Sequence, residues 1–268
     1  MKPKKRIIFT LLYNSNRFVL SRNFRLQTIG DLNWLKRNYN FDNVAYHIDE
    51  LLILDVTRGG KDSEEFCKVV TEISENIFVP LTIGGGINSL EKAKLFFKSG
   101  ADKVSINSSL LDENLVNQIV KNYGKQCLVG SIDVLKKNEE YYVYSNNGTK
   151  LVSRLNEFFE NKEFFNNIGE IYINSINQDG TGNGLDISLA EFVSAKSEVP
   201  FIISGGVGKI TDIKDALKYD FINAVSTAHL LNFIGDSLKK TRLICDECGV
   251  RLAKWPSIDG ILKRNLNS

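Results

Sequence analysis

The chain of 268 residues contains two similar halves displaced by about 120 residues. The segment Pro80-Leu-Thr-Ile-Gly-Gly-Gly-Ile87 returns as Pro200-Phe-Ile-Ile-Ser-Gly-Gly-Val207, and residues 101–107 align with residues 221–227. Similar segments at a fixed spacing form similar supersecondary units. The chain must therefore fold into an architecture that is made of two related halves.

Short apolar runs rich in β-branched residues alternate with longer segments of helical periodicity in both halves. This alternation is typical of βα units that form a parallel sheet. Eight such units need about 250 residues to close into a barrel. We therefore predict one domain over residues 1–268, a (β/α)8 TIM barrel built from two half-barrel repeats. Strands are expected near 6–12, 50–56, 78–83, 102–106, 126–133, 169–175, 200–204 and 221–226.

Composition and charge exclude several classes of protein. A formal net charge of +2 argues against a nucleic-acid binder that neutralises many phosphates. The apolar run after the basic N-terminus, residues 7–12, is too short for a signal peptide or a membrane span, so we expect a cytoplasmic protein. Cys245-Asp-Glu-Cys248 stands without the further ligands that a structural metal site requires. No metal and no cofactor are predicted.

Glycine-rich segments follow a predicted strand in each half and precede a helix. Backbone amides of Gly84, Gly85 and Gly86, and of Gly205 and Gly206, can gather there beside a helix N-terminus, as in the phosphate sites of barrels. One such loop could serve only as a turn, but two loops related by the repeat predict a ligand with a phosphate at each end. Further donors at the ends of the next strands are Asn107, Ser108, Ser226 and Thr227.

Three aspartates, Asp55, Asp133 and Asp179, fall at predicted strand ends. A pair of carboxylates across the barrel mouth could supply the acid and the base for ring closure on a sugar phosphate. A single aspartate at such a position can instead cap a helix or bind a loop. The pair of Asp133 and Asp179 carries the catalytic hypothesis, and Gly180 and Thr181 join the predicted ligand-binding residues.

Four charged residues, Arg6, Glu50, Lys103 and Glu170, fall at the starts of four predicted strands. They should form a ring at the opposite end of the barrel. Such a ring can be a salt-bridged plug on the stability face. Buried ion pairs stabilise poorly, so a complete ring also suggests a function.

Three segments extend beyond what the barrel needs. Residues 13–43 form a long polar connection after the first strand, and residues 141–150 are predicted to form a hairpin that turns at Asn146-Asn-Gly148. Both leave the face where barrels place their sites. Residues from about 239 to 268 have no counterpart in the repeat. They are expected to pack on or beside the barrel, where they cover a groove or bind a partner.

Taken together, these motifs resemble the cyclase subunit of imidazole glycerol phosphate synthase, the HisF-like family, over residues 5 to about 235. The resemblance implies a bisphosphate ligand and a glutaminase partner that docks on the barrel bottom and sends ammonia through the barrel. It implies that the charged ring is the ammonia gate and that Asp102 faces the glutaminase. The segments that carry it are Arg6-Ile-Ile8, Leu54-Asp55, 80–87, 100–108, Ser131-Ile-Asp133, Gln178-Asp-Gly-Thr181 and Ser204-Gly-Gly206.

The chain departs from this family at two positions of the cyclase site. The family uses two catalytic aspartates: Asp133 matches one of them, and Leu12 occupies the position of the other. Leu20 stands where the family has a substrate-binding lysine. The loss of one positioned acid or base typically slows a reaction by about 10² to 10⁴-fold. We therefore expect a degenerate cyclase site and an intact gate.

These departures resemble one branch of the family. In that branch, cyclase-like paralogues work with a glutaminase-like subunit and an N-sugar amidotransferase to make the acetamidino sugars of bacterial surface polysaccharides. Ammonia delivery in such a system is the leading hypothesis. The alternatives are a competent cyclase, a lyase of histidine biosynthesis, and a noncatalytic activator of a glutaminase.

Overall fold

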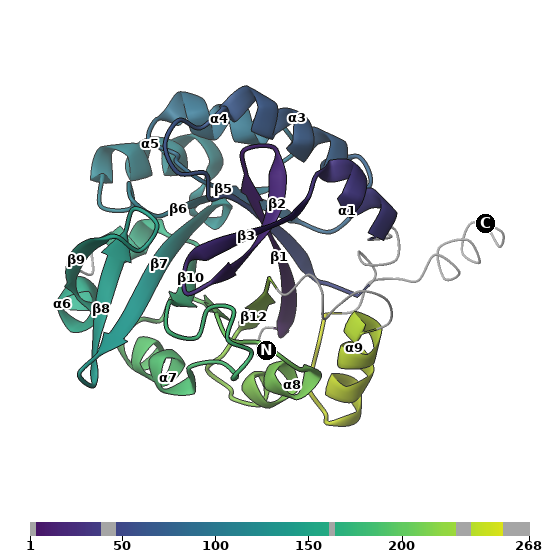
Figure 1. Ribbon diagram of the computed structural model, residues 1–268. Coiled ribbons are helices and arrows are strands. Elements are labelled where there is room, and N and C mark those ends of the chain that lie inside the picture. The colour runs from purple at the N-terminus through teal and green to yellow at the C-terminus, as the bar shows by residue number, and fades with distance from the viewer. Residues whose placement is uncertain (1–3, 39–46, 161–163, 229–236, 254–268) are drawn as a thin grey trace, which may run out of the picture.

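Eight parallel strands close into a barrel, as predicted. The computed structural model describes residues 4–38, 47–160, 164–228 and 237–253, and Figure 1 shows its helices outside the ring of strands. Strand β7 pairs with β10, which closes the sheet. The barrel strands, in order around the ring, are β1 (Arg6–Asn14), β4 (Glu50–Asp55), β5 (Leu81–Gly84), β6 (Lys103–Ile106), β7 (Leu128–Lys137), β10 (Glu170–Ser175), β11 (Phe201–Ser204) and β12 (Ala224–Thr227).

Helices start where the sequence supplies a capping side chain. Asp62, Ser89 and Asp112 each accept a hydrogen bond from the backbone N–H three residues further along the chain, which satisfies one of the free donors of the first turn. The helices are α1 (Leu32–Asn38), α3 (Ser63–Ser74), α4 (Leu90–Lys98), α5 (Glu113–Tyr123), α6 (Leu155–Glu160), α7 (Ile187–Lys196), α8 (Ile210–Leu217) and α9 (Ser237–Glu247), with short 3₁₀ turns at Lys125–Cys127 and Phe164–Asn167.

The apolar core has two parts because alternate strand residues point to opposite sides of the sheet. The larger part fills the space between the barrel and its helices. The smaller part lies inside the barrel and separates its two ends. It consists of Ile8, Leu52, Val129, Tyr172, Ile202 and Ala224.

The long connections form antiparallel strands at the barrel mouth. Residues 13–43, expected only to be a polar excursion, contain strands β2 (Arg17–Arg22) and β3 (Arg25–Gly30), and this hairpin crosses the centre of the barrel in Figure 1. Strand β7 continues into β8 (Glu140–Ser145) through an additional turn. The predicted hairpin at 141–150 is confirmed, because β8 pairs with β9 (Lys150–Arg154) around Asn146-Asn-Gly148.

Helix α9 lies beside α8 and is tied to the bottom of the barrel. Arg242 contacts both carboxylate oxygens of buried Asp49 at 3.0 Å. Leu252 then pairs with Lys5 next to the first strand. Residues 254–268, the rest of the predicted extension, lie outside the described residues.

The described residues contain no helix that is long and apolar enough to span a bilayer. Among the same residues, no group of histidine, cysteine and acidic side chains is arranged to hold a metal ion.

Candidate functional site

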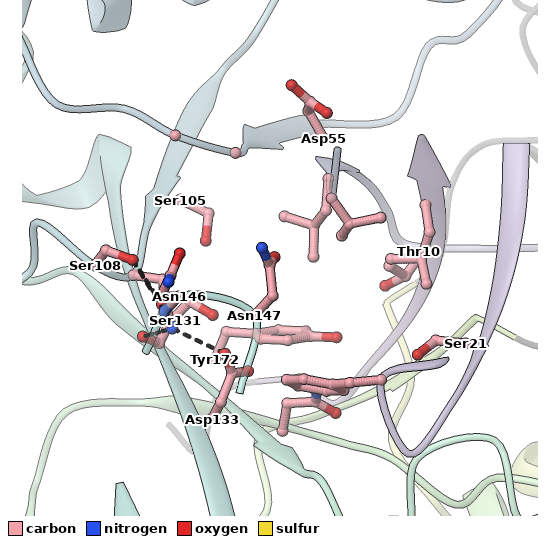
Figure 2. Close-up of a pocket in the computed structure, with 18 of the residues that line it drawn as sticks. Thr10, Ser21, Asp55, Ser105, Ser108, Ser131, Asp133, Asn146, Asn147 and Tyr172 are labelled. Carbon is pink, nitrogen blue, oxygen red and sulfur yellow. Dashed lines mark hydrogen bonds between the residues drawn. The ribbon is translucent and has the colours of Figure 1, made fainter. Parts of the chain in front are cut away.

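A cavity of about 310 Å³ opens at the carboxyl ends of the barrel strands. The βα loops meet at this end, which is where barrels carry their sites. Figure 2 shows Ser105 and Tyr172 from barrel strands around the same space as Ser21 and Asn147 from the long connections. Among the residues singled out from the sequence, the cavity is lined by Leu12, Asp55, Gly85, Gly86, Asn107, Ser108, Asp133 and Asp179.

Hydroxyl groups form the floor of this cavity. The hydroxyls of Thr10, Tyr172 and Ser204 line the cavity. The Thr10 hydroxyl lies 2.5 Å from that of Ser226, which is fully buried outside the lining, and the Tyr172 hydroxyl donates to Ser204 at 2.7 Å. Burial raises the pKa of Tyr172, so its hydroxyl stays protonated and remains a donor. Tyr172 and Thr10 were not among the predicted site residues. The alternation of inward residues along β1 and β10 could have found them.

Asp133 is placed at the edge of the cavity by β7. Asn107 donates to its carboxylate at 3.1 Å, and Asn174 also hydrogen-bonds it. Burial raises the pKa of Asp133 to about 7, while the two amides oppose this rise and nearby Asp179 adds to it. A carboxyl group with this pKa can both give and accept a proton near neutral pH.

The position of the second catalytic carboxylate is apolar. Leu12 lines the cavity at the end of β1, where it pairs with Leu54 of β4 and Val19 of β2. Leu20, on strand β2, packs against the core between the barrel and its helices. Neither leucine can exchange a proton, so the acid and base chemistry of this cavity depends on the carboxyl groups that remain.

Asp179 is engaged by the β2–β3 hairpin. Its carboxylate accepts hydrogen bonds from the Ser21 hydroxyl at 2.5 Å and the Phe24 amide at 3.0 Å. Burial raises the pKa of Asp179. At Gly180, which has a positive φ of 66°, a Cβ would overlap the carbonyl oxygen of Ser21. The structure thus gives Asp179 and Gly180 a role in holding the hairpin over the mouth.

The first glycine loop faces the cavity and is flanked by charge. Gly84 ends β5 against Leu54 and Ser105, and Gly85 and Gly86 line the cavity. Asp55 accepts a hydrogen bond from its neighbour Thr57 N at 2.9 Å. Lys61 forms an ion pair with Asp55 at 3.3 Å and also lines the cavity.

The second glycine loop is packed against its own neighbours. The Gly206 carbonyl accepts from Gly184 N at 2.8 Å, and Gly205 lies against Ser175. The Thr181 hydroxyl donates to the Gln178 carbonyl at 2.8 Å. The residues predicted for ligand binding that the structure places outside the cavity lining are Gly84, Gly180, Thr181, Gly205, Gly206, Ser226 and Thr227.

The four predicted ring residues meet at the opposite end of the barrel. Arg6 lies 3.0 Å from Glu50 and also binds Glu170. Lys103 lies 2.9 Å from Glu50 and 3.3 Å from Glu170. The Thr82 hydroxyl donates to Glu50 at 2.5 Å. Each cation therefore bridges both carboxylates, and the ring is closed.

Opposite charges within the ring offset the effect of burial on the pKa values of Glu170 and Lys103. Burial alone would raise the pKa of Glu170, but Arg6 and Lys103 bring the pKa below its usual range. Burial would likewise lower the pKa of Lys103, and Glu50 and Glu170 raise it instead. Glu170 and Lys103 are thus held in their charged forms. Asp102, at the same end, is exposed and accepts from Leu81 N at 2.8 Å.

Comparison with known proteins places this barrel in a family. A family model described as histidine biosynthesis protein matches residues 35–234. The chain belongs to this family. This result agrees with the resemblance of the motifs to the HisF-like family. Curated relatives of the chain are named as subunits of imidazole glycerol phosphate synthase.

Several curated relatives are similar over nearly the whole chain. "Putative imidazole glycerol phosphate synthase subunit hisF2" of Parasynechococcus marenigrum is 44% identical over 94% of this chain and 95% of its own length. "Imidazole glycerol phosphate synthase subunit HisF" of Dictyoglomus turgidum is 33% identical over 95% and 99%, and that of Microcystis aeruginosa is 36% identical over 85% and 91%. The family is therefore established across the barrel.

Proposed function

We propose that this chain is the barrel subunit of a glutamine-dependent amidotransferase system. A glutaminase docks on the face that carries the charged ring and releases ammonia into the barrel. The ammonia crosses to the cavity side and serves the amidation of a sugar, together with an N-sugar amidotransferase. The product is a component of a bacterial surface polysaccharide, such as an acetamidino sugar. The cavity holds a phosphorylated ligand.

One contrast between the two ends of the barrel carries this proposal. The bottom ring is complete, and each of its cations contacts both carboxylates. At the top, Leu12 and Leu54 present methyl groups where ring closure would need a second proton-transfer group. A barrel that keeps its entrance and lacks half of its acid–base pair is better suited to deliver ammonia than to cyclise a substrate.

The interior between the two ends is compatible with such a passage. Neutral ammonia carries no net charge, so its desolvation costs far less than that of ammonium. It can therefore cross the thin apolar layer around Ile8 and Leu52. The hydroxyls of Thr10, Tyr172 and Ser204 lie beyond this layer and offer hydrogen-bond partners at the cavity floor.

A ring variant tests the passage. In the complex of this chain with the glutaminase and the amidotransferase, glutamine labelled with ¹⁵N in the amide is supplied with excess unlabelled ammonium. Channelled nitrogen keeps its label in the product. Lys103→Met leaves two buried carboxylates with a single cation, so the labelled fraction should fall several-fold, while product formation from added ammonium persists. Lys98→Met, on the outer helix α4, is the control and should keep the labelled fraction.

An equal loss of glutamine-dependent and ammonia-dependent product would contradict the passage. The cyclase alternative has its own measurement. If the isolated chain converts the bisphosphate substrate of histidine synthesis with ammonia at the rate of authentic cyclases, the site is not degenerate. Recovery of a glutaminase with the tagged chain, without an amidotransferase or any product, would instead favour the activator.

A further inference from the structure

The repeat allows the two ends of the mouth to be compared position by position. At a displacement of 120 residues, Lys92 in the first half corresponds to Asp212 in the second. In the same way, Lys61 corresponds to Thr181. Both glycine loops follow a strand and contain glycines with positive φ. Different charges at the corresponding side chains therefore give the two loops different affinities for anions.

Positive charge gathers at the first loop. A Cβ on Gly86 would lie 2.7 Å from Lys61 Cδ and 3.2 Å from Lys92 Nζ, so both lysines lie against this loop. Arg58 also lines the cavity and donates to the carbonyl of Phe24. Asp55 forms an ion pair with Lys61. Within the described part of the chain, Lys92 is in ion-pair contact with no carboxylate; it lies over the Phe96 ring at 5.7 Å.

A carboxylate of the chain itself occupies the second loop. Asp212 accepts hydrogen bonds from Gly208 N at 2.9 Å and from Lys209 N at 3.0 Å. These amides precede helix α8, in the position where a bound phosphate would meet the helix N-terminus. The side chain therefore satisfies donors that a ligand would otherwise use, and its charge repels a second anion.

The protonation of the lysines fits an incomplete site at the first loop. Burial lowers the pKa of Lys61, and nearby Lys92 lowers it further, against the effect of Asp55. Burial also lowers the pKa of Lys92, opposed by Asp55 and the thiol of Cys67. The charged forms of both lysines would gain from a nearby anion.

We propose that the two glycine loops are not equivalent: the first, with Lys61 and Lys92, binds a doubly charged phosphomonoester, and the second, whose glycines lie outside the cavity lining, binds no phosphate. This inference rests on the proposed function only in taking the cavity as a ligand site. It changes the ligand expected from the sequence, because a single phosphomonoester replaces a phosphate at each end.

Binding of ribose 5-phosphate to the isolated full-length chain tests the proposal by calorimetry. One site is expected at pH 7.5. Lys61→Met and Lys92→Met should each weaken binding by about tenfold or more, because each removes a charged partner of the phosphate. Lys94→Met, on the same helix, is the matched control and should bind as the parent does. Thermal unfolding establishes that every variant is folded.

A substitution at Asp212, the position that corresponds to Lys92 in the repeat, tests the proposal by a gain of binding. Asp212→Lys removes the internal carboxylate and places a cation at the second loop, so ribose 1,5-bisphosphate should bind this variant more tightly than the parent. Inorganic phosphate should then occupy two sites instead of one.

The charge of the ligand can be varied as well. Dimethyl phosphate, with a single charge, should bind far more weakly than ribose 5-phosphate. The affinity for ribose 5-phosphate should rise as pH passes the second phosphate pKa of about 6. The titratable groups around the first loop are Asp55, Arg58 and Lys61, which line the cavity, and Lys92, which lies against Gly86; Cys67 affects Lys92 from the core.

Two equal phosphate sites in the parent chain would overturn the proposal. Folded Lys61→Met and Lys92→Met variants with unchanged affinity would also overturn it. These measurements need no glutaminase. A failure of ammonia passage would therefore leave them unaffected, and a failure here would leave the labelled-glutamine experiment unaffected.

Discussion

Asp133 holds its proton to a pH at which an ordinary aspartate has lost it. Its carboxyl group lies in a buried part of the cavity wall, and the two amides of Asn107 and Asn174 reduce but do not cancel the effect of burial on the pKa. The group is therefore half protonated near pH 7. A single carboxyl group in this state can donate a proton when it is protonated or accept one when it is ionised. It cannot act as acid and base in the same step, as a pair of aspartates can.

This pKa predicts a dependence of stability on pH. Because the pKa of Asp133 is about 7 in the folded chain and near 4 in the unfolded chain, the folded state binds the extra proton between these values. Stability is therefore lost as pH rises from about 4 to 7. Asp133→Asn should remove this loss. At pH 8 its free energy of unfolding in urea should exceed that of the parent by up to about 4 kcal/mol, because each unit of the pKa shift is worth about 1.4 kcal/mol. The two proteins should converge near pH 4, and an unchanged difference at both pH values would contradict the assignment.

Individual site residues were predictable from the sequence only in part. Asp133, Gly85 and Gly86 were predicted from their positions at strand ends, and they line the cavity, whereas Gly84 does not. Their roles in catalysis and ligand binding remain predictions. Asp179 is at the predicted end of the barrel, but its partners are Ser21 and Phe24. A strand-end position does not reveal which distant segment satisfies a carboxylate. The assignment of Asp179 to ligand binding remains a prediction.

The β2–β3 hairpin is held over the mouth by contacts with the turn after β10. Asn23 donates from its side chain to the carbonyls of Ile176 and Asn177, and its backbone N–H binds Asp179. Close packing at Gly180 completes this attachment. The hairpin thus limits how a ligand enters the cavity.

A substitution at the turn should release the hairpin. In Gly180→Ala, the new Cβ would overlap the Ser21 carbonyl at a φ of +66°, so the hairpin must move away, at a cost of about 1–3 kcal/mol. Hydrogen exchange of the Phe24 amide, which binds Asp179, should accelerate. Gly59→Ala is the control, because it has a φ of +92° and nothing within 4 Å of its Cβ. Equal exchange in both variants would contradict the attachment.

The hairpin itself escaped prediction because its partners are far away in the sequence. Residues 18–20 are apolar, but nothing in residues 13–43 indicates that the tip of the hairpin meets residues 176–180. By contrast, the turn at Asn146-Asn-Gly148 was predictable, since its residues favour positive φ on their own.

At the scale of the whole molecule, the barrel is tied at the bottom by its C-terminal helix. Asp49 is buried, accepts from Ile7 N at 2.8 Å and faces Arg242. Burial raises the pKa of Asp49, and Arg242 opposes this rise. The ion pair connects α9 to the segment that enters β4.

Loss of Arg242 should therefore destabilise the fold in a pH-dependent way. In Arg242→Met, the pKa of Asp49 rises further above its unfolded value, so the loss of stability is small near pH 4 and grows as pH rises. At pH 8 it should reach about 3–5 kcal/mol, the usual effect of breaking a buried ion pair. Urea unfolding at both pH values measures it. Asp49→Asn in the same chain should restore part of the loss, and a loss that does not vary with pH would contradict the linkage.

The overall architecture was predictable because the repeat restricts it so strongly. Eight apolar runs in two related sets leave a closed barrel as the natural arrangement, and the positions of the four ring residues at strand starts followed from that alone. The difference between the two glycine loops did not follow, because it depends on where Lys92 and Asp212 direct their side chains.

The two cations and two carboxylates of the ring balance each other. Opening the bottom of the barrel therefore requires the separation of buried opposite charges. If Lys103 swings away, Glu50 and Glu170 are left to share Arg6, and breaking such a buried arrangement costs about 3–5 kcal/mol. The open form would then be present in about one molecule in a hundred to one in several thousand. Under the proposed function, the chain without a glutaminase would therefore pass little ammonia, and a glutaminase that offers a new acceptor to one cation would raise the open population by orders of magnitude.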